Sequence, residues 1–202
     1  MSVMGRIFAA VYDRALSAQE EAGLREHRRA IVGRAQGRVL EIGAGTGLNL
    51  DHYGPGVAEL VLTEPEEPMA RRLRERATRG EIVGAPADEL PYPDDSFDAV
   101  VSTLVLCTVP DQDRAIAEIR RVLRPGGQLL FIEHVRSHDA KTARWQDRVL
   151  PVWRFMCHGC HPNRDTAAAL TRAGFTLEVE SWELPKAPAI VRPVVEGVAT
   201  AA

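Results

Sequence analysis

The sequence of 202 residues contains no apolar run that approaches the roughly 20 residues of a membrane-spanning helix. Its N-terminus also lacks the short hydrophobic core of a signal peptide, so we expect a cytoplasmic protein with no stable membrane insertion. Only three cysteines are present, and this odd number does not suggest a framework of disulfides. The 16 glycines and 13 prolines fall well short of a disordered composition.

An excess of charge of one sign is also missing. Lysine and arginine together number 25 and the acidic residues 28, which leaves a formal net charge of -3. The chain therefore lacks the excess of positive charge that is typical of nucleic-acid-binding proteins. We expect a small-molecule partner rather than a nucleic acid. Its length fits a single domain of the usual ~100–200 residues.

What the sequence does contain is a regular alternation of strand and helix patterns. Short apolar runs typical of buried strands alternate with segments whose apolar residues recur at helical spacing, and this predicts a parallel sheet covered by helices. The expected helices are 20–35, 67–78, one capped by Asp111, and 164–173, and the expected strands are 39–42, 60–63, 81–85, 97–106 with its exit loop, and 128–133. Two final strands, 175–182 and 194–199, follow each other without a helix, so they should pair as an antiparallel hairpin.

Residues 39–50 join a buried strand to a glycine turn and then to a helix. Gly43, Gly45 and Gly47 allow the backbone to bend sharply and to approach a ligand closely. The helix that follows points its free N–H groups at the same place. The third glycine comes one residue earlier than in the G-x-G-x-x-G fingerprint of dinucleotide sites, whereas the distal acid that binds ribose hydroxyls is present as Glu64.

This combination resembles the class I S-adenosylmethionine (AdoMet) methyltransferases, in particular the methyltransferase type 11 (UbiE-like) group. Residues 84–98, GAPADELPYPDDSFD, are similar to the family's G-D-A-E-x-L-P-F-P-D-x-S-F-D, with Pro86 in place of an acidic residue. The resemblance implies a Rossmann-like three-layer α/β/α sandwich, a seven-stranded, mostly parallel sheet of order 3-2-1-4-5-7-6, and AdoMet as cofactor. It places Glu64 on the ribose and Asp88 near the adenine. The expected cofactor-binding residues are Tyr12, Glu41, Gly43, Ala44, Gly45, Gly47, Asn49, Glu64, Pro65, Ala87, Asp88, Thr103 and Leu104.

The C-terminal half narrows the resemblance to the alkyl-thiol methyltransferases of the methyltransferase-like group. The similar segments are TLVLCTV at 103–109, RVLRPGG at 121–127, EHV at 133–135, GC at 159–160 and VRP at 191–193. Those relatives carry an N-terminal apolar helix, whereas residues 1–34 here are amphipathic and charged. The implied activity is methyl transfer to a small-molecule acceptor, most simply a thiol. An O-, N- or C-methyltransferase and a non-catalytic AdoMet-binding module are the alternatives.

Methyl transfer to a thiol does not require a strong catalytic base, because a thiol of pKa ~8.5 is already a few per cent thiolate near neutrality. His134 follows the fifth strand, at the edge where open sheets bind their ligands. It is the expected catalytic residue, as a base or as the group that orients the acceptor, and Glu133 is the second candidate. The alternative is a histidine that only caps the strand. The expected substrate-binding residues are Cys107, His134, Trp153, Cys160 and His161.

Residues 157–161, CHGCH, match three sequence motifs with specific functions, namely haem attachment, a redox-active cysteine pair and a zinc site. Haem attachment would need export to an oxidising compartment, for which the sequence shows no signal peptide. A redox motif is expected at the start of a helix in a thioredoxin-like unit, whereas the first strand here is followed by the glycine loop. Zinc ligands packed into five residues need a distant second pair, which only Cys107 and His134 could supply. We therefore expect no metal and a segment that lines the acceptor pocket, with apolar walls from Trp153, Phe155 and Met156.

The N-terminal segment resembles the family's mobile lid over the cofactor. Phe8, Val11, Tyr12 and Leu16 recur at about helical spacing, and packing into the core is the alternative. The nearby charged residues, Arg25, Glu26, Arg28 and Arg29, are typical of a solvated helix face. The expected organisation is a single domain over 1–202, with a helical lid at 1–35, an AdoMet-binding core at 36–135, and an acceptor-pocket segment with the closing hairpin at 136–202.

Overall fold

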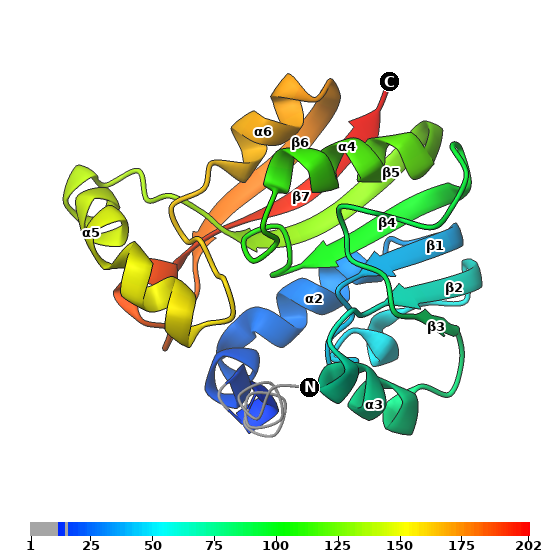
Figure 1. Cartoon of the computed structure of the whole chain (residues 1–202), viewed down its shortest axis with the longest axis horizontal. Helices are drawn as coiled ribbons and strands as arrows, with labels where there is room; N and C mark the ends of the chain where they lie inside the picture. The colour runs from blue at the N-terminus through cyan, green and yellow to red at the C-terminus, as the bar shows by residue number, and fades with distance from the viewer. Residues whose placement is uncertain (1–11, 15) are drawn as a thin grey trace.

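The computed structural model describes residues 12–14 and 16–202, and its centre is a seven-stranded sheet of order β3-β2-β1-β4-β5-β7-β6 (Figure 1). Strands β1 to β5 run parallel, and β7 pairs antiparallel with both β5 and β6. The strands are β1 (Gly37–Ile42), β2 (Val57–Thr63), β3 (Glu81–Val83), β4 (Phe97–Thr103), β5 (Leu123–His134), β6 (Phe175–Glu183) and β7 (Pro193–Ala201). The predicted strand order and the predicted C-terminal hairpin are confirmed.

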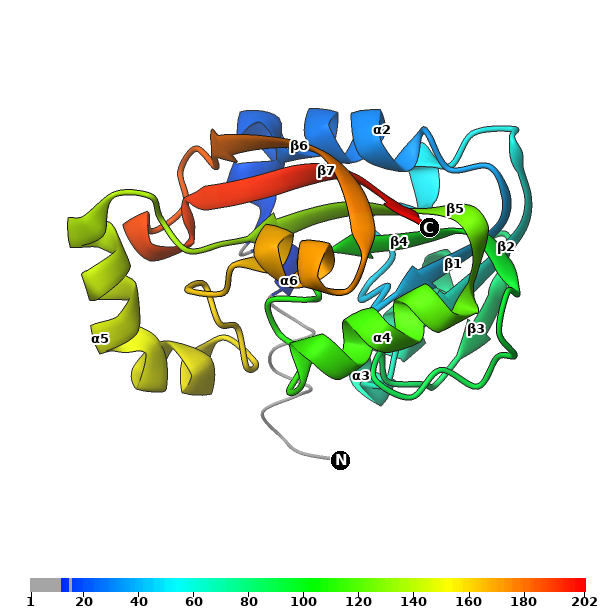
Figure 2. The same ribbon diagram turned by 90° about the horizontal axis from the view of Figure 1, so that it is seen from above.

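Helices cover both faces of this sheet. They are η1 (Glu20–Leu24), α2 (Arg25–Val32), η2 (Leu50–His52), α3 (Glu67–Arg76), α4 (Gln112–Val122), α5 (Ala140–Met156), α6 (Thr166–Arg172) and η3 (Ala189–Val191). Figure 2 shows α2 on one face and α4 with α6 on the other, which confirms the three layers. Within residues 12–14 and 16–202, no helix is both long enough and apolar enough to cross a membrane.

Alternating strand residues fill the two layers of core. In β1, Val39 packs into the hydrophobic cluster under α2, whereas Leu40 and Ile42 pack into the cluster under α4. Strands buried on both faces are continuously apolar, as the sequence pattern indicated. The Asp111 cap is confirmed, because its side chain accepts a hydrogen bond from the Arg114 backbone N–H at 3.0 Å.

Several boundaries differ from the predictions. The helix predicted directly after the glycine loop is wrong: between β1 and β2 the chain forms only turns and the short 3-10 helix η2, so no α-helix there points its first N–H groups at the loop. The predicted helix over 20–35 is instead the π-helical segment η1, which is kinked at Gly23 (φ 135°), followed directly by α2. Strand β5 begins at Leu123, directly after α4, so the predicted strand over 128–133 is its second half. Helix α5 has no counterpart in the predictions. Its apolar residues do not mark a buried face, since Trp145 and Val152 are exposed, and periodicity therefore signals it weakly.

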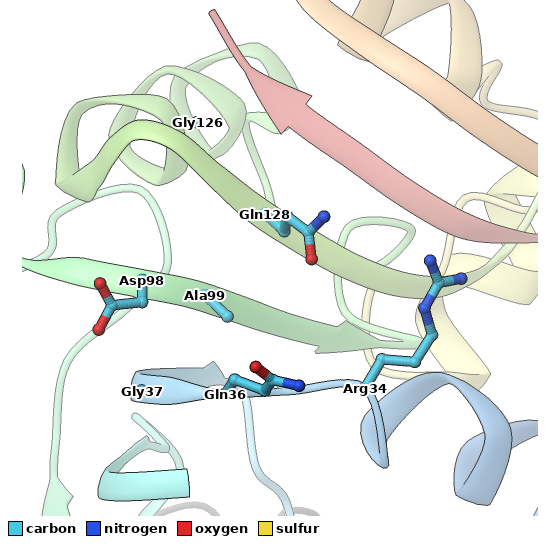
Figure 3. Close-up of a pocket in the computed structure, with 7 residues that line it drawn as sticks. All are labelled: Arg34, Gln36, Gly37, Asp98, Ala99, Gly126 and Gln128. Atoms are coloured by element: carbon cyan, nitrogen blue, oxygen red, sulfur yellow. The ribbon is translucent and has the colours of Figure 1, made fainter. Parts of the chain in front are cut away.

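A hollow of about 710 Å³ lies at the amino ends of β1, β4 and β5 (Figure 3). It is lined by Arg34, Gln36, Gly37, Asp98, Ala99, Gly126 and Gln128. Open α/β sheets bind their ligands at the carboxyl ends of the strands, which is the opposite edge of this sheet. The candidate site is therefore built from the carboxyl edge and not from this hollow.

Candidate active site

The glycine loop leaves β1 at the carboxyl edge of the sheet, between β2 and β4. A Cβ atom at Gly43 would lie 2.8 Å from Val105, and one at Gly47 would lie 2.6 Å from Leu50, so these two glycines are required by packing as well as by their positive φ. A Cβ at Gly45 would meet no atom closer than 3.8 Å. At Gly45 the positive φ of 60°, rather than tight packing, is therefore what favours glycine.

Glu64 follows β2 and holds this loop. One of its carboxylate oxygens accepts a hydrogen bond from the Gly45 backbone N–H at 2.8 Å, and the other accepts one from the Glu66 backbone N–H at 2.8 Å. Burial raises the pKa of Glu64, and the two backbone hydrogen bonds oppose that rise. Each carboxylate oxygen keeps a second acceptor position, so the group can also receive a hydroxyl. The next predicted residue, Pro65, is exposed.

Arg28 is buried, which corrects the expectation of a solvated face, although the other charged residues of that face, Arg25, Glu26 and Arg29, are exposed. Only 2% of Arg28 is exposed. Its guanidinium donates to a Glu20 carboxylate oxygen at 2.8 Å, to Asn49 Oδ1 at 3.1 Å and to Thr103 Oγ1 at 2.7 Å. A buried guanidinium is tolerated only with such partners, so Arg28 ties α2 to the glycine loop and to the end of β4.

Glu41 belongs to the same buried network. Its Oε1 accepts from Asn49 Nδ2 at 2.8 Å, and its Oε2 accepts from the Tyr53 hydroxyl at 2.7 Å. Burial raises the pKa of Glu41 to about 7, against the hydrogen bonds that favour the charged form. The predicted cofactor residues Glu41, Asn49 and Thr103 are thus brought together, but their polar atoms bind one another.

Tyr12 precedes η1 in the chain and is influenced by charges of this region. Burial raises its pKa to about 12, and among the charges that act on its phenol are those of Arg28, Cys107 and Glu64. The phenol is therefore close enough to feel both the carboxylate beside the glycine loop and the cysteine that follows β4. Phe8 and Val11, predicted with it as parts of a lid, lie outside the described residues.

Ala87 and Asp88 lie in the loop between β3 and β4. Ala87 is buried, with 8% of it exposed, and the Asp88 carbonyl accepts a hydrogen bond from Arg114 Nε at 2.9 Å. The Asp88 carboxylate forms no ion pair with the residues that the structure describes. It is consequently available to an outside donor.

Cys107, His134 and Cys160, named here the thiol–imidazole cluster, meet at the carboxyl ends of β4 and β5. The His134 Nδ1 atom lies 3.8 Å from Cys107 Sγ and 3.9 Å from Cys160 Sγ, and all three atoms lie within 4.8 Å of one another. All three cysteines of the chain, the third being Cys157, are free thiols. The contact between the two cluster thiols raises the pKa of Cys107 and lowers that of Cys160, because Cys107 donates to the Cys160 sulfur.

The loop that carries Cys107 is held rigidly by its surroundings. Leu104 adopts φ 61°, a strained conformation for a residue with a side chain, and its N–H donates to the Ile132 carbonyl at 2.7 Å. The Glu133 carboxylate accepts the Cys107 N–H at 3.0 Å. Glu133, the second candidate base, is therefore occupied in holding this loop, and the imidazole of His134 faces the thiols.

The predicted substrate residues within and after α5 contact the cluster unequally. The His161 N–H donates to the Cys107 carbonyl at 2.6 Å, which joins this segment to the loop after β4. Trp153 packs on the same hydrophobic cluster as Cys107 and Cys160, and its buried indole, after Cys107 and His134, helps to lower the pKa of Cys160. Phe155 and Met156 do not form apolar walls, because 83% and 66% of them are exposed on α5.

Comparison with known proteins identifies the family. Residues 40–131 match the family model described as a methyltransferase domain. Thiol S-methyltransferase TMT1A from Homo sapiens is 34% identical over 170 residues, which covers 80% of this chain and 69% of the relative. The ubiquinone/menaquinone biosynthesis C-methyltransferase UbiE from Bordetella avium is 35% identical over 170 residues, covering 70% of this chain and 66% of the relative. The chain thus spans about two thirds of each curated relative.

A solved structure agrees on the fold. A SAM-dependent methyltransferase from Thermotoga maritima superimposes with a TM-score of 0.73 at 23% identity, with 98% of each chain covered. The glycine loop fits the AdoMet that this family uses, because the tight turn at Gly45 and the Glu64 carboxylate that holds it lie together at the switch point of the sheet. The chain therefore belongs to the class I AdoMet-dependent methyltransferases, and AdoMet is its cofactor.

Proposed function

We propose that the protein transfers the methyl group of AdoMet to a small thiol, which binds at the thiol–imidazole cluster. The observation that carries the proposal is the position of the cluster. It lies at the carboxyl ends of β4 and β5, and β4 is the direct neighbour of β1, which carries the glycine loop. The names of the relatives support the same acceptor, since human TMT1A and TMT1B from Rattus norvegicus are thiol S-methyltransferases.

Bound AdoMet supplies a methyl group on a sulfonium, which is already a strong electrophile. The protein has to hold the reactants in line and exclude water. In this proposal the glycine loop holds the methionine part, Glu64 the ribose and Asp88 the adenine amine. Glu41 accepts a hydrogen bond from Asn49 at 2.8 Å and so helps to hold the segment that follows the glycine loop.

On the acceptor side, His134 orients the thiol or accepts its proton. Its imidazole already lies within 4 Å of two sulfur atoms, at 3.8 and 3.9 Å, so a sulfur acceptor suits this environment. The buried indole of Trp153 is, after Cys107 and His134, among the groups that lower the pKa of Cys160, so this environment favours a thiolate. Tyr12 closes the site from the N-terminal side.

A panel of acceptors tests the proposal. The protein is incubated with methyl-labelled AdoMet and with alkyl thiols, phenols, amines and carbon nucleophiles such as quinols. We expect labelled thioether from the thiols. Labelled product from a carbon, oxygen or nitrogen acceptor alone would show that the acceptor is not a thiol. Carbon acceptors are included because of the similarity to UbiE. AdoMet binding in a calorimeter without any labelled product would instead favour a non-catalytic binding module.

Glu64→Ala is expected to weaken AdoMet binding by ~1–3 kcal/mol, because it removes hydrogen bonds between a carboxylate and the ribose. The same change frees the Gly45 N–H, which now donates to this carboxylate at 2.8 Å. Titration calorimetry with S-adenosylhomocysteine measures the loss. Glu67→Ala is the matched control, since Glu67 is exposed at the start of α3. Equal affinity of the two variants for S-adenosylhomocysteine would show that Glu64 does not bind the ribose.

His134→Ala is expected to lower the turnover of the thiol by about 10²- to 10⁴-fold, the range typical of general acid–base groups. The affinity for S-adenosylhomocysteine should stay close to that of the wild type, because the imidazole faces the Cys107 and Cys160 thiols and not the glycine loop. Initial rates at saturating AdoMet measure the effect, and His138→Ala, on an exposed loop, is the control. Unchanged turnover would make His134 a structural residue.

A further inference from the structure

We propose that Cys107, His134 and Cys160 bind a zinc ion, and that the open fourth position of this ion takes the acceptor thiol. The second part rests on the proposed function. The CHGCH segment alone cannot close a zinc site and needs a distant second pair of ligands. The fold supplies that pair, because it places Cys107 and His134 beside Cys160.

The distances between the three ligand atoms suit tetrahedral zinc. Bonds of about 2.3 Å to sulfur and 2.1 Å to nitrogen separate a sulfur and a nitrogen ligand by about 3.6 Å and two sulfur ligands by about 3.8 Å. The two sulfur–nitrogen distances in the cluster are 3.8 and 3.9 Å, and all three atoms lie within 4.8 Å of one another. The cluster therefore accepts the ion with small movements of side chains.

The chemistry of the donor set also favours zinc. Thiolates are soft ligands that select zinc over magnesium or calcium. Two thiolates and one imidazole form the set that catalytic zinc sites use when a fourth position stays open for a substrate. Two thiolates also balance the charge of the ion. This matters because Cys107 and Cys160 are only 1% and 5% exposed, and a net buried charge would be costly.

The ligands are held in place by three different elements. The Cys107 N–H donates to Glu133 at 3.0 Å, and its carbonyl accepts from the His161 N–H at 2.6 Å. The Cys160 N–H donates to the Cys157 carbonyl at 3.0 Å, while the histidine ends β5. Ligands that are already fixed lose little conformational freedom when the ion binds.

Such a site would activate the acceptor directly. An incoming thiol replaces a water on zinc and gives its proton to the solvent, since a coordinating thiol is deprotonated outright. The sulfur then forms its bond to the methyl carbon while the carbon–sulfonium bond of AdoMet breaks, and the electron pair of that bond stays on the departing sulfur. The resulting thioether carries no charge and is a weaker ligand, so it leaves. His134 acts in this case as a ligand and not as a base.

Metal titration of the intact protein tests the site. The protein, kept reduced with a phosphine and freed of metal, is titrated with Zn²⁺ against a competing chelator. We expect one zinc per chain, and a loss of more than about 100-fold in affinity in Cys107→Ser, Cys160→Ser and His134→Ala, since even outer-shell partners contribute about 10- to 100-fold. Cys157→Ser is the matched control, because this cysteine belongs to the same segment and lies outside the cluster. It should bind zinc as the wild type does.

Cobalt provides a readout that depends neither on activity nor on a variant. Co²⁺ in the wild-type protein should show the intense absorption of tetrahedral cobalt with thiolate ligands, and added 2-mercaptoethanol should shift that spectrum. Equal zinc affinity in all variants, or a loss that follows Cys157, would overturn the inference. The inference would also be overturned if the reduced wild type bound no zinc and instead formed a Cys107–Cys160 disulfide in air. Mass spectrometry would detect this disulfide as a loss of two hydrogens.

Two further outcomes distinguish an error in the proposed metal site from an error in the proposed function. Thiol methylation by the metal-free protein, at the rate of the zinc-loaded protein, would overturn the role of zinc and keep the thiol acceptor. A zinc-loaded protein whose cobalt form does not respond to thiols, and which methylates none, would overturn both the acceptor role of the ion and the proposed function.

Discussion

Replacing Glu133 by alanine is expected to lower the free energy of unfolding by about 3–5 kcal/mol. The side chain is fully buried. Its carboxylate accepts hydrogen bonds of 2.8 to 3.0 Å from four donors, the Ser102 hydroxyl and the backbone N–H groups of Val105, Leu106 and Cys107. Alanine leaves these donors without a partner in a region closed to water, and each unsatisfied donor costs about 1–3 kcal/mol, less what relaxation of the loop recovers.

Urea denaturation followed by circular dichroism measures this loss. Glu178→Ala is the control, because Glu178 also lies on a strand but is exposed, and it should change the free energy of unfolding by no more than about 0.5 kcal/mol. Glu133→Gln keeps one carbonyl acceptor and should fall between the two. A loss below about 1 kcal/mol in Glu133→Ala would show that the loop after β4 is held by other contacts.

The second large effect is a dependence of stability on pH that comes from Glu41. Burial raises its pKa from 4.5 to about 7 in the folded protein. A carboxyl group with a raised folded pKa binds its proton more tightly when folded, so its contribution is fully present below the unfolded pKa and is lost as the pH rises to 7. Between pH 5 and pH 8 the wild type should lose about 2–3 kcal/mol relative to a variant that cannot ionise at this position.

Glu41→Gln is that variant, since an amide retains one acceptor for Asn49 or Tyr53 and carries no charge. Unfolding in urea at pH 5, 6, 7 and 8, without cofactor, measures the difference between the two proteins. Glu89→Gln, at an exposed position, should follow the pH profile of the wild type. Parallel profiles for wild type and Glu41→Gln would mean that Glu41 is ionised in the folded protein throughout this range.

The sequence by itself determined the sheet and the glycine loop. Continuous apolar runs such as 39–42 pack on both faces of a parallel sheet, and two strands without an intervening helix form β6 and β7. Glu64 could be placed beside the loop because the ends of neighbouring parallel strands meet at one edge, and its carboxylate does accept the Gly45 N–H. These features depend on local periodicity and on neighbours in a regular sheet, which a sequence encodes directly.

The tertiary structure alone decided which polar residues meet. Arg28 looked like part of a solvated face, and its burial depends on partners from the loop after β1 and from the end of β4. Helix α5 carries exposed apolar side chains, so its pattern does not indicate a buried face. His134 lies 27 residues after Cys107 and 26 residues before Cys160, and the three meet only because β4, β5 and the segment after α5 end at one edge of the sheet. Contacts of this kind depend on the relative placement of distant elements, and for this reason the acceptor side of the site, unlike the cofactor side, could not be derived from local pattern.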